Sequence, residues 1–182
     1  MSDTVPDFAA VVGARVRDLR KARGMSLGEL AKATGLGKGT LSELESGRRN
    51  PTLATLFAIT TALGVPISAA LPVTEESAGA GEPIRGDAIE ATLVERFTDV
   101  SAVTEVYRVQ VMAGREQDSA PHASGVTEHW IVYAGVLELG PAEAMVRLAP
   151  GESTSFRADV PHRYRASSEG DVAATLVVRY PV

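Results

Sequence analysis

The chain has 182 residues, of which 45% are hydrophobic and 23% charged, and it contains no cysteine. This composition is typical of a globular protein with one large or two small domains. It excludes a disulfide scaffold, a cysteine nucleophile and cysteine-ligated zinc or iron–sulfur sites. The chain has no apolar run of about 18 residues, and its first residues lack the basic-then-apolar order of a signal peptide. We therefore expect a cytoplasmic protein that does not associate with a membrane.

The formal net charge of −5 is unevenly distributed. Residues 1–66 contain nine Lys and Arg against six Asp and Glu, a net charge of +3, whereas residues 67–182 have nine against seventeen, a net charge of −8. Such asymmetry indicates one segment that faces nucleic acid beside a segment with another task.

The first third of the chain has the spacing of short helices. Apolar residues recur at helical intervals from Phe8 to Leu63, glycines stand where each helix should end, and Ser26 with Glu29 is a capping-box sequence. These signals predict helices at 6–22, 26–33, 37–45 and 52–62, followed by a turn at 67–70.

A change of pattern follows. Residues 71–87 are rich in Gly, Ala, Glu and Pro and show no period, which predicts a linker between a helical domain at 6–70 and a second domain at 88–182. In the second domain the apolar residues alternate with period two. This pattern predicts an all-β sandwich or barrel with strands at 91–98, 103–112, 129–139, 144–148, 153–157 and 174–180.

The helices 26–33 and 37–45, joined by a tight turn at Gly35, predict a helix-turn-helix. Residues 10–66 resemble the XRE-type helix-turn-helix of phage repressors and bacterial regulators, most specifically in the stretch LSELESGRRNPTL. The resemblance implies that helix 37–45 enters the major groove of double-stranded DNA. It implies groove-facing residues Lys38, Gly39, Thr40, Ser42 and Glu43, and phosphate contacts from Arg23, Arg48, Arg49, Asn50 and the start of helix 26–33.

Three positions depart from that family's pattern. Gly28 stands where the family often has Gln, and Gly37 and Gly39 replace small hydroxyl residues, which predicts a poorer helix cap and fewer base contacts. Specificity then rests on few residues or on DNA shape. We expect Glu45 to be structural, bonding the backbone of the loop. The alternative is a helical bundle that binds a protein partner.

The three histidines all follow the linker. His122, Glu128 and Gly135 have the spacing of the first cupin motif, with Ser124 in the place of its second histidine, and His162 fits the second motif with Ala166 in its Asn position. Residues 88–182 thus resemble a cupin. Together, the two resemblances imply an α + β protein of two domains: an N-terminal all-α helix-turn-helix bundle and a C-terminal all-β cupin barrel (double-stranded β-helix).

The cupin resemblance also implies a site inside the barrel. His122, Glu128 and His162 are the candidate ligands for a divalent Zn, Fe, Mn or Ni ion, although sensor cupins joined to XRE-type domains frequently lack a metal. By strand alternation Glu128, Trp130, Val132 and Ala134 face inward and His129 faces the other way. The candidate effector pocket consists of His122, Glu128, Trp130, His162, Tyr107, Phe156 and Tyr164, which would suit a cationic or polar small molecule.

These features predict a transcription regulator that binds an operator through residues 10–66 and a small-molecule effector through the barrel. A homodimer is expected because one short recognition helix reads too few base pairs. The alternative is a metal-dependent cupin enzyme of the oxygenase or epoxidase type that carries a helix-turn-helix. A third possibility is a barrel that serves only to dimerise.

Overall fold

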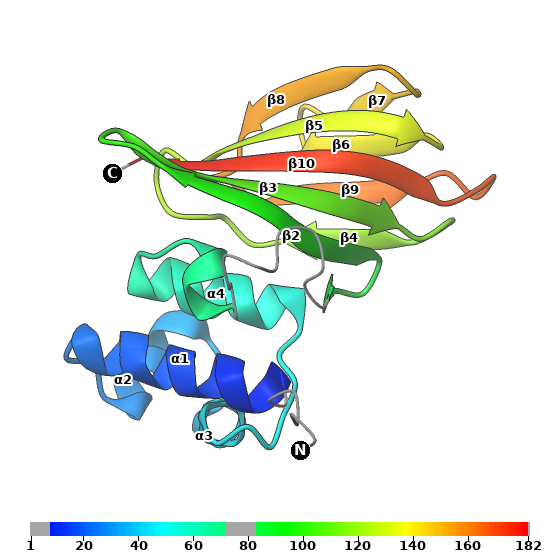
Figure 1. Cartoon of the computed structure of the whole chain (residues 1–182). Coiled ribbons are helices and arrows are strands. Elements are labelled where there is room, and N and C mark those ends of the chain that lie inside the picture. Colours follow the sequence, from blue (N-terminus) through cyan, green and yellow to red (C-terminus); the bar gives the residue numbers. More distant parts are fainter. Residues whose placement is uncertain (1–7, 72–82, 182) are drawn as a thin grey trace, which may run out of the picture. The chain divides into compact units, whose positions relative to one another are not determined.

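The computed structural model describes residues 8–71 and 83–181. The chain divides into two compact units, Met1–Val73 and Thr74–Val182, and each is described by itself (Figure 1). No helix among the described residues is both long enough and apolar enough to cross a membrane.

The first unit is entirely helical, and each of the expected helices is present. The elements are α1 (Phe8–Ala22), α2 (Leu27–Thr34), α3 (Lys38–Glu45), α4 (Leu53–Leu63) and the short 3₁₀ helix η1 (Ile67–Ala70). One apolar face of each α-helix is buried in a common core, because apolar residues three and four apart lie on the same side of a helix. The fully buried core side chains include Val12, Val16, Leu30, Leu41, Leu44, Leu56, Ile59, Leu63 and Ile67.

The second unit is built from two facing antiparallel sheets. Its strands are β1 (Ile84–Arg85), β2 (Ile89–Thr98), β3 (Ala102–Val111), β4 (Glu116–Ser119), β5 (Thr127–Ala134), β6 (Leu137–Pro141), β7 (Val146–Leu148), β8 (Ser153–Arg157), β9 (His162–Ala166) and β10 (Val172–Pro181). The larger sheet has the order β1-β2-β3-β10-β5-β8, and the smaller, which lies behind it in Figure 1, has the order β4-β9-β6-β7.

The interior of this unit lies between the two sheets. Alternate residues of β3, β5 and β10 are buried there, among them Tyr107, Val109, Trp130, Val132, Leu176 and Val178. The two facing sheets form a jelly roll, as the resemblance to a cupin implies. The histidine cluster described below lies on the inner side of these sheets.

The expected single strand at 129–139 is wrong, because the structure divides it into β5 and β6, which belong to different sheets. The break is at Gly135, whose φ of +75° belongs to the left-handed region and whose close approach to the Asp171 carbonyl leaves no room for a Cβ atom. The expected inward position of Ala134 is also wrong. Ala134 is exposed, because a bulge between Ala173 and Ala174 shifts the register at this end of β5.

Three short strands were not expected from the sequence. Strand β1 lies inside the expected linker 71–87, so the sheet begins before residue 88, while 72–82 of that linker lie outside the described residues. Alternation of apolar and polar residues does not predict strands β4 and β9, because some of their inward residues are polar. These residues are Gln117 in β4, and His162 and Tyr164 in β9.

Candidate nucleic-acid interface and buried histidine cluster

Helix α2 is capped at both of its ends. The Ser26 hydroxyl accepts a hydrogen bond from the Glu29 amide at 3.2 Å, and the Ser26 amide donates to the Glu29 carboxylate at 2.7 Å, which completes the expected capping box. Gly35 ends α2 with a φ of +70°. The chain therefore turns sharply into α3 and presents it as a separate, exposed helix.

Helix α1 supports α3 from behind. A Cβ atom on Gly13 of α1 would lie 2.1 Å from the Leu44 carbonyl oxygen of α3, so the two helices approach as closely as a glycine allows. The Arg20 guanidinium binds both oxygens of the Glu45 carboxylate at 2.6 and 2.7 Å and donates to the Met25 carbonyl at 2.8 Å. Glu45 is thus structural, but its partner is Arg20 and not the loop backbone as expected from the sequence.

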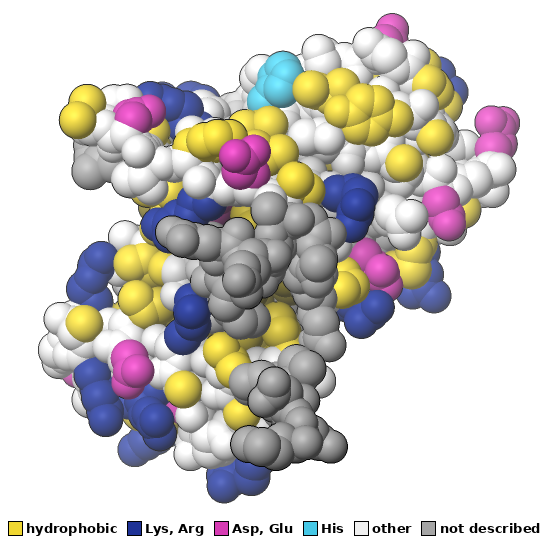
Figure 2. Space-filling model, viewed as in Figure 1, with side chains coloured by type: hydrophobic (Ala, Val, Ile, Leu, Met, Phe, Trp, Pro, Cys, Tyr) yellow, Lys and Arg dark blue, Asp and Glu magenta, His cyan; other side chains and the backbone are white. Residues whose placement is uncertain are grey.

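The side chains expected to contact DNA lie mainly on the solvent side of this unit. Lys38, Gly39, Ser42 and Glu43 on α3 are exposed and Thr40 is half-buried, while Arg48, Arg49 and Asn50 are exposed in the following loop. Figure 2 shows Lys and Arg side chains gathered over the helical unit. This exposure leaves the expected groove-facing and phosphate-binding side chains accessible to a ligand.

Two arginines of this surface already have contacts within the chain. Arg49 forms an exposed ion pair with Glu43, with 3.5 Å between the Arg49 nitrogen and the carboxylate. Arg23 donates to the Gly64 carbonyl at 3.3 Å, at the end of α4. Exposed pairs of this kind are weak and exchange readily for a phosphate.

The N-terminus of α3 is bare. Gly37 is the N-cap residue and makes no side-chain cap bond, and a Cβ atom on Gly39 would meet nothing within 4 Å. The poorer cap expected from Gly37 is therefore present. The absence of side chains at these two positions lets the backbone of this turn approach a ligand closely.

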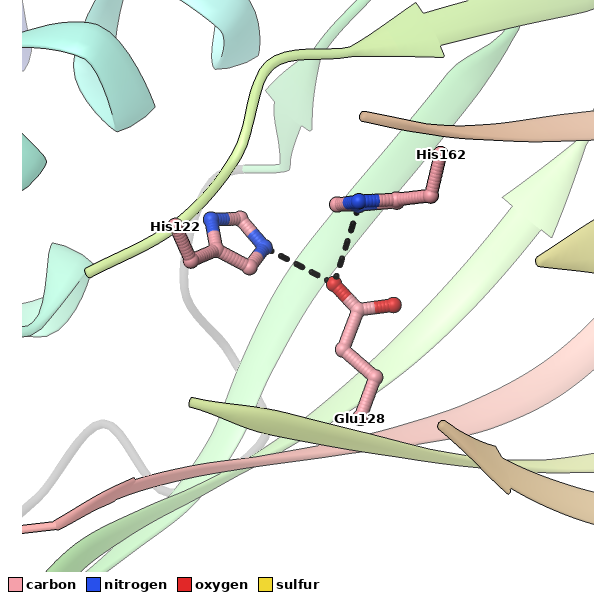
Figure 3. A group of neighbouring side chains, drawn as sticks. All are labelled: His122, Glu128 and His162. Carbon is pink, nitrogen blue, oxygen red and sulfur yellow. Dashed lines mark hydrogen bonds and ion pairs between the residues drawn. The ribbon is translucent and has the colours of Figure 1, made fainter. Parts of the chain in front are cut away.

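The second site is a buried cluster inside the β unit, formed by His122, Glu128 and His162 (Figure 3). Glu128 lies on β5 and His162 begins β9, whereas His122 lies in the segment between β4 and β5, where its amide donates to the Ala158 carbonyl at 2.9 Å. Each of the three side chains is at most 2% exposed. The fold thus brings together residues 40 positions apart in the chain.

The Glu128 carboxylate is the centre of the cluster. Its Oε1 atom lies 2.8 Å from His122 Nε2 and 3.5 Å from His162 Nε2, as the dashed lines of Figure 3 mark. Its Oε2 atom accepts a hydrogen bond from Trp130 Nε1 at 2.8 Å. The Tyr164 hydroxyl lies 2.9 Å from Oε1 and 2.8 Å from Oε2. A carboxylate with this many donors stays ionised in an apolar interior.

The electrostatic consequence is a mutual shift of pKa values. Burial raises the pKa of Glu128, but the hydrogen bonds and charges of His122 and His162 outweigh burial and hold it well below its usual range. Burial lowers the pKa of His162, but the hydrogen bond and charge of the Glu128 carboxylate raise it by more, so the net shift is upward. Glu128 and His162 therefore shift each other's pKa in opposite directions, down for the carboxyl group and up for the imidazole.

The donor set of the cluster fits a divalent metal ion. The candidate ligand atoms of His122, Glu128 and His162 all lie within 4.8 Å of one another. His162 Nδ1 lies 2.8 Å from the Val160 carbonyl, which holds the ring with Nε2 toward Glu128, whose Oε1 atom is 3.5 Å away. Two imidazole nitrogens and one carboxylate are a common ligand set for Zn, Fe or Ni. Ser124 is exposed and contributes nothing to the cluster.

The remaining pocket residues expected from the sequence divide into two groups. Trp130 and Tyr164 contact Glu128, and the Phe156 ring lies 5.5 Å from that of His162. Tyr107 is buried but donates to another carboxylate, Glu105, at 2.6 Å. His129 lies on the opposite face of β5, as expected, where its Nδ1 is 2.7 Å from the Ser155 hydroxyl.

Sequence reasoning missed several of these partners. Glu105 is fully buried, and its position two residues before Tyr107 on a strand was the available signal, because alternate residues share a face. The contacts of Arg20 and Gly13 left no such signal, since they depend on how α1 crosses α3.

The comparisons agree on both units. The family model described as Helix-turn-helix matches residues 16–69, and the one described as Cupin domain matches residues 107–179. The chain is 33% identical to the HTH-type transcriptional regulator SutR of Escherichia coli (strain K12), over 96% of this chain and 98% of the relative. The chain belongs to this family of HTH-type transcriptional regulators.

One solved structure supports the same two folds for this regulator. An HTH_3 family transcriptional regulator from Vibrio cholerae is 29% identical and matches with a TM-score of 0.84, over 96% of this chain and 98% of that one. Hydroxypropylphosphonic acid epoxidase from S. wedmorenis also matches, over 97% and 100% of the two chains, at 22% identity and a TM-score of 0.45. A likeness as weak as the latter says nothing about activity.

Proposed function

We propose that this regulator binds a double-stranded DNA operator in the cytoplasm and changes its operator affinity when the β unit binds a divalent metal or small-molecule effector. The observation that carries the proposal is the exposed face of α3 together with the loop 48–50, held on α1 by Gly13 and by the ion pair of Arg20 and Glu45. Exposed Lys and Arg side chains provide the salt-dependent affinity for phosphates, and Lys38, Thr40, Ser42 and Glu43 read base edges.

A binding experiment separates these two roles. Replacing Arg48 and Arg49 by Ala is expected to weaken binding to every DNA sequence and to reduce the salt slope by about 1 for each lost phosphate contact. Replacing Lys38 or Thr40 by Ala should instead change which operator is preferred. Fluorescence anisotropy over a range of salt concentrations, combined with selection from a random DNA library, measures both effects. If both pairs of variants behaved alike, the assignment of α3 as the recognition helix would be wrong.

Within the β unit, we propose that His122, Glu128 and His162 hold the metal ion. Such an ion would supply a fixed positive charge and open coordination positions for an effector in the barrel interior. Glu128 is less suited to a cationic organic effector, because the His122 ring, the Trp130 indole and the Tyr164 hydroxyl surround its carboxylate, whereas a metal ion would be held by the His122 and His162 rings themselves together with Glu128. The Trp130 indole contacts Glu128, and the Phe156 ring lies 5.5 Å from that of His162, so both aromatic side chains lie beside the cluster.

The same cluster favours a second candidate function. Two histidines and one carboxylate within 4.8 Å are also the ligand set of non-haem iron oxygenases, which would make the β unit an epoxidase-like enzyme. Iron at one equivalent per chain in the purified protein, with turnover of an added substrate, would support an enzyme. Operator binding that responds to the metal without any turnover would support the regulator.

We further propose that the regulator acts as a homodimer through its β unit. The eight residues of α3 reach only a few base pairs, so two copies related by a two-fold axis are needed for a specific site. Half-sites about 34 Å apart, or a multiple of that, would fit such a dimer. Inserting about 5 base pairs between the half-sites turns one of them to the opposite face of the duplex. The insertion should abolish tight binding in a gel-shift titration, whereas about 10 inserted base pairs should restore it; equal affinity for all three spacings would contradict the dimer.

A further inference from the structure

The two oxygens of the Glu128 carboxylate are not equivalent. Oε1 faces the imidazoles, with His122 Nε2 at 2.8 Å and His162 Nε2 at 3.5 Å. Oε2 accepts the Trp130 indole N–H at 2.8 Å, and the Tyr164 hydroxyl bridges the two oxygens, 2.9 Å from Oε1 and 2.8 Å from Oε2. The indole N–H therefore binds only Oε2, whereas the Tyr164 hydroxyl can donate to either oxygen.

This asymmetry has a consequence for metal binding. If a metal ion took Oε1, the Tyr164 hydroxyl would donate to Oε2 beside the Trp130 indole N–H, and Oε2 would then have few lone-pair positions left for the cation. We propose that Trp130 and Tyr164 are positioning residues that restrict Glu128 to a single ligand oxygen, Oε1, toward a metal held with His122 and His162. The inference rests on the metal site proposed above and names the residues that shape it.

The surroundings keep both donors in place. Trp130 and Tyr164 are buried, and their ring centroids are 4.9 Å apart. The Tyr164 ring is also 5.4 Å from that of His162, in an edge-to-face arrangement. Because the rings are fixed by packing, removing only the hydroxyl or the indole N–H takes away the hydrogen bond and keeps most of the shape of the site.

The donor geometry also selects among metals. A site with two nitrogens and one carboxylate oxygen favours Zn²⁺, Fe²⁺, Co²⁺ or Ni²⁺. Ca²⁺ requires six to eight oxygen ligands and often a carboxylate that contributes both oxygens. A Glu128 held to one oxygen should therefore exclude Ca²⁺.

The test is a titration of the full-length chain with Co²⁺ alone, using the visible absorption of the bound ion and the fluorescence of Trp130, the single tryptophan of the chain. Tyr164→Phe is expected to weaken Co²⁺ binding about 10- to 100-fold, as loss of an outer hydrogen bond to a ligand does. Its Co²⁺ spectrum should also lose intensity, because a freed Oε2 raises the coordination number. A purely structural role for Tyr164 would lower stability without changing the spectrum.

The chain offers a matched control and a second variant. Tyr133→Phe removes a phenol hydroxyl outside the cluster, one that donates to the Thr175 hydroxyl at 3.0 Å, and should leave Co²⁺ affinity and spectrum unchanged. Trp130→Phe, followed by absorption alone, should reproduce the effect of Tyr164→Phe. Wild-type affinity and spectrum in both Tyr164→Phe and Trp130→Phe would overturn the inference while leaving the metal site intact. Failure of the wild-type chain to bind Co²⁺ would overturn the metal proposal and the inference with it.

Discussion

At the scale of single residues, glycines decide how closely α3 packs on α1 and which surface α3 exposes. Gly13 lies in the middle of α1, and a side chain there would collide with the Leu44 carbonyl of α3 at 2.1 Å. Gly39 lies on α3 with open space around its Cα atom. The two glycines differ in their surroundings. There is no room for a methyl group at Gly13, whereas a methyl group at Gly39 would fit and would touch nothing within 4 Å.

Substituting these two glycines should have opposite effects on stability. Gly13→Ala is expected to destabilise the helical unit by about 1–3 kcal/mol, because the strain of overpacking outweighs the gain in helix propensity. Gly39→Ala should stabilise it by up to about 1 kcal/mol, since only the propensity changes. Urea unfolding followed by the circular dichroism of the helices measures both. A Gly13→Ala variant as stable as the wild type would show that α1 and α3 can separate freely.

At the scale of elements, the loops around the histidine cluster are joined to each other by hydrogen bonds. Asp159, between β8 and β9, accepts a hydrogen bond from the Gly125 amide at 2.9 Å and pairs with Arg157. The His122 amide binds the Ala158 carbonyl and the Ala158 amide binds the Val126 carbonyl, each at 2.9 Å. The segment carrying His122 and the one leading into His162 are thus held as one unit.

The contacts of Asp159 predict a defined dependence on pH. The hydrogen bonds from Arg157 and from the Gly125 amide lower the pKa of Asp159 from 3.8 to about 2. A lowered pKa means that its stabilisation is complete above the unfolded-state pKa and is lost as the pH falls through about 2. Asp159→Asn should therefore have a lower free energy of unfolding than the wild type at neutral pH. This difference in free energy should disappear as the pH falls to the folded-state pKa of Asp159.

Urea unfolding followed by Trp130 fluorescence at several pH values tests this, because Trp130 reports on the β unit alone. Asp18→Asn, on the exposed side of α1, is the control and should not change the curve. A stability difference that stayed constant from neutral to strongly acidic pH would contradict the assignment to Asp159.

At the scale of the whole molecule, the proposed regulation requires a coupling between the histidine cluster and DNA binding. An effector shifts operator affinity only if it binds the DNA-competent state more or less tightly than the other state. Couplings of this kind are usually 5- to 150-fold, about 1–3 kcal/mol, and they are reciprocal. Metal in the cluster should therefore change operator affinity, and operator DNA should change metal affinity by the same factor.

A pair of titrations measures this coupling. Operator affinity of the wild type with Zn²⁺ and with a chelator is expected to differ within that range, whereas Glu128→Gln, which loses the ligand charge, should show no difference. Zn²⁺ affinity measured with and without operator should give the same factor. If Zn²⁺ bound the wild type without changing operator affinity, the metal would be structural and the effector would have to be another molecule.

The helical half of the fold could be predicted almost completely from the sequence. The capping box of Ser26 and Glu29, the glycine at position 35 and the apolar spacing act over three or four residues, so they leave a local pattern. In the β unit the long strands were predictable by alternation. The break at Gly135 and the strand β9 were not, because they depend on which sheet a segment joins.

The sequence by itself determined which residue types stand at the cupin positions, and so named His122, Glu128 and His162 as a set. It also placed the chain among helix-turn-helix regulators, a placement that the relatives confirm. Only the tertiary structure decided that Oε2 of Glu128 is already occupied by Trp130 and Tyr164, that Glu45 binds Arg20, and that Gly13 touches Leu44. The reason is physical: motifs are read along the chain over a few residues, whereas hydrogen bonds and close contacts join side chains that are far apart in sequence and meet only when the sheets and helices assemble.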